Sequence, residues 1–187
     1  MTLMIKGHGW VKEGACGCAG KSLQWQYADF RLLFAQLIKD VVLAFPIENF
    51  GRFNQSSRLA IFSIALALYD ADIHYARDKK QNIGLLGTSL DGALVSNLDY
   101  FKDYVLAGRK MGRGNLFIYT LPSSPLAEAA IHFGLQGPLL YMRYLEQPEK
   151  NLLMQAESIV GNKEASAMLT VVLNSNEAAA HFVLTEE

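Results

Sequence analysis

The sequence predicts an α/β fold built in layers, with one mixed sheet of five strands covered by helices. Short apolar runs typical of strands alternate along the chain with longer segments whose apolar residues recur every three or four positions. The last two strand-like segments follow each other directly, so part of the sheet is antiparallel while helices connect the rest. No internal repeat, low-complexity tract or linker divides the 187 residues, so we expect residues 1–187 to form a single domain.

The first part of the chain is predicted to hold one strand and two helices. Residues 3–11 are apolar and interrupted by glycine, which is typical of a strand entering a glycine-rich loop. Apolar residues spaced by three and four across residues 23–45 predict an amphipathic helix, which Pro46 ends. A second helix follows the polar turn 53–57 and runs to about Asp72. It is apolar nearly all round, so we expect it to be buried between layers.

The middle of the chain is predicted to hold a strand and two further helices. Residues 82–87 form a compact apolar strand, and a helix follows it to about Ala107. A loop rich in glycine and basic residues, 108–114, closes this unit. Residues 121–125 start the next helix, with serine as a cap and proline in the first turn, and Gly134 stops it.

The last part is predicted to hold three strands and one helix. Residues 139–145 form a strand, and a helix over residues 147–160 ends at Gly161. Two segments that end the chain, Ala167–Leu173 and Ala178–Thr185, are separated by a short turn of polar residues and predict a hairpin.

Composition argues against several classes of function. The formal net charge is -1 and no long run of lysine and arginine occurs, so we expect no binding to nucleic acid or to an anionic membrane. The richest apolar run, residues 59–69, is much shorter than the roughly 20 residues that span a bilayer. The first six residues lack the basic and apolar regions of a secretion signal, so we expect a cytoplasmic protein.

Cysteine and histidine spacing gives no sign of a metal site. Cys16 and Cys18 lie one residue apart in a glycine- and alanine-rich stretch, without the basic neighbours that activate a thiolate, so we expect ordinary reduced thiols. No ligand spacing occurs among the four histidines, and we expect neither a metal nor a cofactor. These histidines are His8, His74, His132 and His181.

Residues 131–138, which read IHFGLQGP, resemble the turn before the nucleophile strand of β-ketoacyl synthases. Three further segments are similar to landmarks of that family and occur in the same order, namely residues 58–73, 83–89 and 156–172. The resemblance covers most of the chain from about Asn54 onward. It implies the N-terminal half of the thiolase-like fold.

The same resemblance implies that the catalytic equipment is missing. Enzymes of this family use a cysteine thiolate as nucleophile and two histidines supplied by the second half of the chain. The equivalent of the cysteine falls near Leu145 or Glu146, so we assign no catalytic residue, and the substrate-binding residues stay unknown. Gln147 offers a closer match to chain-length factors, which often carry glutamine at this position, after a shift of one or two residues. The competing interpretation is that Gln147 simply opens a helix before Pro148.

Ser89 suggests a second kind of chemistry. It lies between a predicted strand and a predicted helix, as the nucleophile does in α/β-hydrolases, with His132 or His181 as a candidate base. The second glycine of that motif is displaced to Gly92, and the simpler interpretation is a serine that caps the helix. The glycines of this segment also lack the spacing and the lysine of a phosphate-binding loop.

The loop 109–113, which reads RKMGR, is the only compact basic cluster. One interpretation is that it attracts an acidic acyl carrier protein; the other is that it is a solvated loop without a partner.

We therefore expect a non-catalytic β-ketoacyl-synthase-like protein, an accessory or chain-length-factor-like partner in fatty-acid or polyketide-type metabolism. One alternative is the N-terminal subunit of a split synthase that a second chain completes, and another is an acyl-binding module. We expect a homodimer or a complex with a ketosynthase, because an exposed edge strand invites pairing. The residues of that edge are Leu140, Tyr141, Met142, Arg143 and Tyr144.

Overall fold

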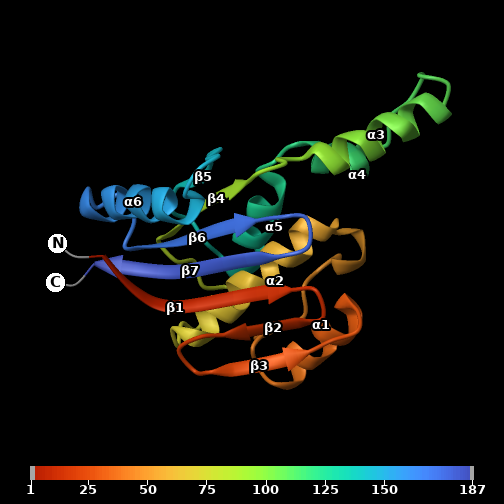
Figure 1. The fold of residues 1–187 in the computed structure, drawn as a ribbon. Helices are drawn as coiled ribbons and strands as arrows, with labels where there is room; N and C mark the ends of the chain where they lie inside the picture. Colours follow the sequence, from red (N-terminus) through yellow and green to blue (C-terminus); the bar gives the residue numbers. More distant parts are fainter. Residues whose placement is uncertain (1–2, 186–187) are drawn as a thin grey trace.

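The computed structural model describes residues 3–185 and has the layered α/β fold that the sequence predicts. One mixed sheet has the strand order β3-β2-β1-β7-β6-β4-β5, and helices pack on both of its faces (Figure 1). Its strands are β1 (Leu3–Lys12), β2 (Ala15–Cys18), β3 (Leu23–Gln26), β4 (Ile83–Ser89), β5 (Leu139–Tyr141), β6 (Ala167–Leu173) and β7 (Ala178–Thr185). The longer helices are α1 (Phe30–Lys39), α2 (Gln55–Asp70), α3 (Leu94–Leu106), α5 (Ser124–Phe133) and α6 (Pro148–Gly161).

The sheet has seven strands, so the expected number of five is wrong. All five expected strands are present, and β2 and β3 extend the sheet beyond β1 in two antiparallel steps. Strand β2 escaped prediction because its glycine-rich sequence resembles a loop, and β3 because its residues were included in a predicted helix. That helix starts only after Asp29, whose carboxylate accepts hydrogen bonds from the N–H groups of Arg31 and Leu32 and so caps α1.

Helix α2 is buried on nearly all sides, as predicted. The side chain of Asn54 caps it by accepting a hydrogen bond from Ser57 N at 2.9 Å. The helix lies across β1 and β7 (Figure 1), and the large core between the sheet and helices α1, α2 and α5 includes Phe62, Leu66 and Phe133. Gly7 and Gly9 of β1 allow this close approach, because a Cβ atom at either position would overlap the backbone of α2.

Helix α6 covers the opposite face of the sheet, over β6, β7 and β4. A second, smaller core lies beneath it and includes Leu152, Ala156, Met168 and Val183. Strand β5 ends at Tyr141 rather than at residue 145. Helix α5 begins at Ser124, inside the predicted range, and Gly134 ends it with a left-handed φ of 68° as predicted, but the serine at its cap position makes no side-chain hydrogen bond.

Helix α3 and the short helix α4 (Gly114–Phe117) form an arm that extends away from the sheet (Figure 1). The arm leaves the body after β4, and no residue of α3 or α4 is buried. Ser89 does not cap α3; the cap position is Ala93, which makes no side-chain hydrogen bond, and the predicted capping role of Ser89 is wrong. Among residues 3–185, no helix is long and apolar enough to cross a membrane.

Candidate functional site

The candidate site lies at the start of α6, where the chain returns from the sheet edge. Gln147 occupies the cap position with φ 44° and ψ 52°, in the left-handed region that costs a non-glycine residue roughly 1 kcal/mol or more. Its carbonyl accepts a hydrogen bond from Asn151 N at 3.0 Å, whereas its side chain makes no capping bond and is exposed. The structure therefore places Gln147 at the opening of a helix, with its amide side chain free to meet a ligand.

Two histidines lie under the first turn of α6. His8 of β1 and His181 of β7 are direct cross-strand partners, and their rings stack with centroids 4.4 Å apart. Glu149 extends from α6 toward the sheet, and its Oε1 lies 3.4 Å from His181 Nε2. Burial, together with the nearby His8, lowers the pKa of His181, while Glu149 opposes this shift. His181 is therefore a neutral, buried imidazole at pH 7.

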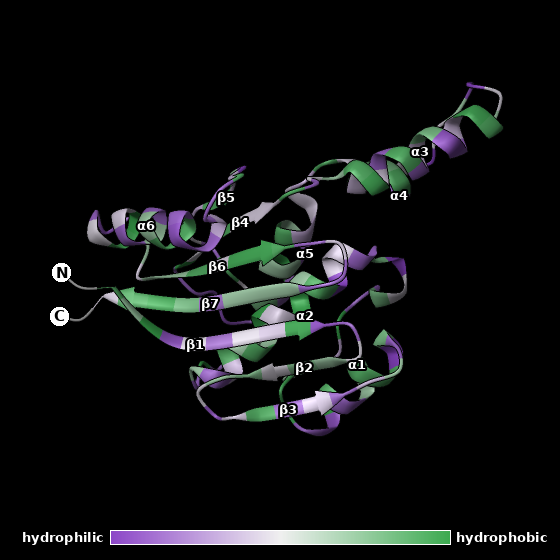
Figure 2. Ribbon diagram, in the orientation of Figure 1, coloured by the Kyte–Doolittle hydropathy of each residue, from purple (hydrophilic) through white to green (hydrophobic). Residues whose placement is uncertain are grey.

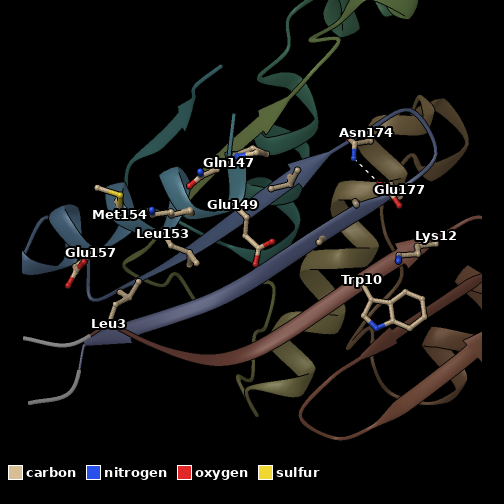
Figure 3. Close-up of a pocket in the computed structure, with 15 residues that line it drawn as sticks. Leu3, Trp10, Lys12, Gln147, Glu149, Leu153, Met154, Glu157, Asn174 and Glu177 are labelled. Carbon is tan, nitrogen blue, oxygen red and sulfur yellow. Dashed lines mark hydrogen bonds between the residues drawn. The ribbon is translucent and has the colours of Figure 1, made fainter. Parts of the chain in front are cut away.

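A groove of about 700 Å³ runs between α6 and the sheet face formed by β1, β6 and β7 (Figure 3). Its apolar lining includes Trp10, Leu153 and Val172, and Gln147 also lines it. The indole of Trp10 packs over Gly17 of the neighbouring strand, where a Cβ atom would contact the ring. The groove also carries charges of both signs on Lys12, Lys150, Glu149, Glu157 and Glu177. Such a lining suits a ligand with an apolar body and a polar end.

No thiol belongs to this site. Cys16 and Cys18 are buried on β2, and Cys16 joins the core on the α2 side of the sheet, opposite α6. Burial, and then the neighbouring Cys18, raises the pKa of the Cys16 thiol to about 12. The pKa of Cys18 is also raised, by burial and by the carboxylate of Asp70. Both groups are protonated at neutral pH and are poor nucleophiles.

The structure does not assemble the hydrolase that Ser89 suggested. Ser89 is buried at the end of β4, and its carbonyl accepts a hydrogen bond from the hydroxyl of Tyr141 at 3.1 Å. His132 packs among Phe45, Tyr75 and Phe133 at the end of α5, and His181 faces Glu149. Within residues 3–185, neither histidine forms a hydrogen bond with Ser89. Nor do any three metal-binding side chains gather there in a way that would hold a metal ion.

The predicted edge residues lie at the end of the sheet, because β5 pairs only with β4. Leu140 is exposed and Tyr141 half-buried in the strand itself. The next three residues lie beyond the strand, where Met142 N donates to Gly87 O at 2.9 Å and Tyr144 N to Thr88 Oγ1 at 3.3 Å. Arg143 is exposed between them. The five residues thus lie beside β4 and form a short, irregular edge of the sheet.

Sequence reasoning missed the pairing of His8 with His181 and the position of Trp10 in the groove. His8 and Trp10 alternate on one face of β1, and this alternation is a signal that the sequence contains. The partner strand and its register were needed to bring His181 beside His8, and these depend on the folded sheet.

No protein-family model matches the sequence, and no curated protein matches it. Solved structures do share its fold. The chain is similar to the ishigamide ketosynthase/chain length factor, with a TM-score of 0.68 and 16% identity over 99% of this chain and 62% of the other. It is also similar to a β-ketoacyl synthase from Burkholderia phymatum, with a TM-score of 0.63 and 14% identity over 99% of this chain and 59% of the other.

A third similar structure is a ketosynthase in complex with its chain length factor from Xenorhabdus doucetiae. Here the TM-score is 0.61 and the identity 15%, and the match covers the whole of this chain and 80% of the other. The chain thus spans about three fifths of the length of the first two structures. At these identities the likeness establishes the fold, and this chain has the thiolase-like fold of the ketosynthases.

Proposed function

We propose that the chain is a non-catalytic ketosynthase-like accessory protein of fatty-acid or polyketide-type metabolism, comparable to a chain length factor. The observation that carries the proposal is Gln147. It opens the helix that follows β5, within one or two residues of the position where the resemblance puts the nucleophile. A carboxamide in this place cannot form the thioester that condensation requires, and both thiols lie buried in another strand.

The expected partner is a ketosynthase, or a second copy of this chain, that pairs with the edge formed by β5. Two of the similar structures are described as containing both a ketosynthase and a chain length factor. Another is described as a type II acyl carrier protein in complex with its ketosynthase, which supports an encounter with a carrier protein. We propose that the protein acts in the cytoplasm and that residues 1–187 form one domain.

The groove beside α6 favours a second candidate, an acyl-binding module. Its volume of about 700 Å³ and its apolar lining suit a medium-sized acyl chain, while Gln147 and Lys12 offer donors to a polar end. A split synthase is the third candidate; in that case a companion chain supplies the cysteine and both histidines. It is favoured by the greater length of the ketosynthase and β-ketoacyl synthase structures.

Intact-protein mass spectrometry tests the proposal. The purified chain is incubated with acyl-loaded and malonyl-loaded carrier protein, alone and with a ketosynthase, and the mass of each protein is followed. We expect no acyl adduct on this chain and no condensation product when it is alone. A covalent acyl adduct on the wild-type chain would contradict the proposal. A free acyl ligand that copurifies without a covalent bond would favour the binding module.

A further inference from the structure

A cavity of about 630 Å³, separate from the groove beside α6, lies where helices α1 and α2 begin. Four segments that are distant in the sequence converge on it, namely the β1–β2 turn, the connection from β3 to α1, the first turn of α2 and the β6–β7 turn. Figure 2 shows that these turns and helix starts are rich in hydrophilic residues. Because the sheet and the two helices fix all four segments, the cavity is preformed and polar.

Two arginines, Arg31 and Arg58, line this cavity, and neither forms an ion pair within residues 3–185. Arg58 is half-buried, and its guanidinium carbon lies 5.2 Å from the ring centroid of Phe50. Phe50 stacks on Phe34 with centroids 4.7 Å apart, so an aromatic cluster holds the guanidinium in place. The Nε atom of Arg58 is buried and has no hydrogen-bond partner among the described residues. A guanidinium held in this way is costly unless an anion compensates its charge.

The start of α2 adds to the positive potential of the cavity. Arg58 lies in the first turn of this helix, where the aligned peptide dipoles leave a partial positive charge. The cap is the neutral amide of Asn54, and the first turn holds no acidic residue. An arginine in such a turn is opposed by the field of its own helix. Sequences break local rules of this kind mostly at functional sites.

The carboxylates of the lining do not balance the two arginines. Asp29 accepts hydrogen bonds from Arg31 N at 2.7 Å and from Leu32 N at 2.9 Å, so its charge offsets the start of α1. Glu13 is exposed in the β1–β2 turn, which leaves one carboxylate facing two guanidinium groups and the start of α2. A neutral donor is also present. Gln55 Nε2 donates to Asn176 Oδ1 at 2.9 Å, which leaves the amide nitrogen of Asn176 to bind a ligand.

We infer that this cavity binds a small phosphate monoester, whose phosphate group contacts Arg31 and Arg58. The forked guanidinium group matches phosphate oxygens in a bidentate way, and a doubly charged group suits two arginines better than a carboxylate does. The rings of Tyr27 and Phe30 also line the cavity and stack with centroids 5.6 Å apart, so they offer a wall for an aromatic or apolar body. The inference goes beyond the proposed function, because the cavity is separate from β5, from Gln147 and from the groove.

Isothermal titration calorimetry with phenyl phosphate tests the inference, with benzoate as the singly charged comparison. The wild-type chain should bind one phenyl phosphate, and more tightly than benzoate. Arg31→Gln and Arg58→Gln should each raise the dissociation constant about 10-fold or more, because each removes a charge-assisted hydrogen bond. Arg52→Gln is the matched control, because Arg52 is exposed just before α2 but lines a different cavity, and its affinity should equal that of the wild type.

Three calorimetric results would overturn the inference. The first is no saturable binding of phenyl phosphate up to about 20 mM. The second is benzoate binding as tightly as phenyl phosphate, which would exclude phosphate as the recognised group. The third is an affinity for phenyl phosphate that both arginine variants retain, or that Arg52→Gln lowers as much as they do. Arg31 is exposed, so Arg31→Gln should keep the far-ultraviolet circular dichroism of the wild type and tests the site even where Arg58→Gln fails to fold.

Nuclear magnetic resonance on the nitrogen-15-labelled wild type locates the bound phenyl phosphate. The side-chain amide signals of Gln55 and Asn176 should shift as the ligand is added, because both residues line the cavity. The indole N–H signal of Trp10, which lies in the groove beside α6, should stay in place. A shift at Trp10 without shifts at the two amides would put the ligand in the groove and overturn the inference. Neither experiment depends on acyl transfer, so its failure is distinguishable from failure of the proposed function.

Discussion

At the scale of single residues, Gln147 makes the position of the missing nucleophile testable. We expect Gln147→Cys to create a thiol that iodoacetamide modifies in the native protein, because the side chain is exposed and the start of a helix stabilises a thiolate. Cys16 and Cys18 should react only after unfolding. Intact-mass measurement of labelling over time checks this, with Ile131→Cys as the control for an exposed thiol in the last turn of α5, away from the start of α6, which should react more slowly. Equal labelling of the native wild type would show that the burial of β2 is wrong.

His132 links one half-buried ring to stability at low pH. Burial, and then the charge of Arg77, lowers the pKa of His132 from 6.5 to about 4. Between these values the unfolded chain binds a proton that the folded chain excludes, so the free energy of unfolding falls as the pH falls from 6.5 to 4. The loss from this residue is at most about 3 kcal/mol.

Urea unfolding at a series of pH values checks this expectation. The free energy of unfolding of the His132→Phe variant should decline less over the same range, because the variant lacks the titrating imidazole. Phenylalanine suits the aromatic neighbours and removes a buried Nε2 that has no hydrogen-bond partner within residues 3–185. The burial of His181 acts in the same direction and remains in the variant. If the free energies of unfolding of wild type and variant declined in parallel, protonation of His132 would cost the folded state nothing.

Sequence alone located some of these residues better than others. The spacing of the helix placed Gln147 at its start, because Pro148 and the apolar periodicity are local signals. The contact of His8, His181 and Glu149 joins residues from both ends of the chain and depends on strand order, so no local pattern contained it.

At the scale of elements, the crossing of β1 over α2 depends on glycine. We expect Gly9→Ala to lower the free energy of unfolding by about 2 kcal/mol or more, because the new methyl group overlaps the backbone of Ser63 and Ala67. Gly51→Ala, where no atom lies within 4 Å of the new Cβ, should change it by less than about 0.5 kcal/mol. Chemical denaturation of both variants measures the difference. A similar small effect at both positions would mean that the sheet and the helix are less closely packed than described.

The elements that the sequence predicted well are those with strong patterns. The largely apolar helix α2 and the hairpin of β6 and β7 were both expected within a few residues of their observed bounds. Strands β2 and β3 were missed because each is four residues long, and β2 consists of small residues that propensity assigns to loops. They exist because β1 offers an edge on which to pair.

At the scale of the whole molecule, the arm is expected to be dispensable for folding. Replacing residues 94–117 with a glycine–serine linker of about six residues should shift the midpoint of thermal unfolding by only a few degrees, since no residue of α3 or α4 is buried. Differential scanning calorimetry at a concentration where both proteins are monomeric makes the comparison. Loss of a cooperative transition would show that the arm supports the core through contacts such as that between Asn54 and Ser96.

The alternation of helices and strands predicted the layered architecture of the whole molecule, and the resemblance predicted the fold family. The projecting arm was not foreseen, because a helix with an apolar stripe looks in sequence like one that packs on its own domain. Only the folded structure shows that no residue of α3 or α4 is buried.

The pairing of Leu3 with Thr185 places the two ends of the described chain side by side, as Figure 1 shows. The first and last strands, β1 and β7, are therefore neighbours in the sheet, and the two ends of the described chain are close enough to be joined. A gene rearranged to start and stop at the tip of the arm, with Leu3 and Thr185 joined by a short loop, would encode the same sheet in a new order. In such a permuted protein, both new ends would lie far from α6 and its groove, where a fluorescent or affinity tag leaves the candidate site untouched.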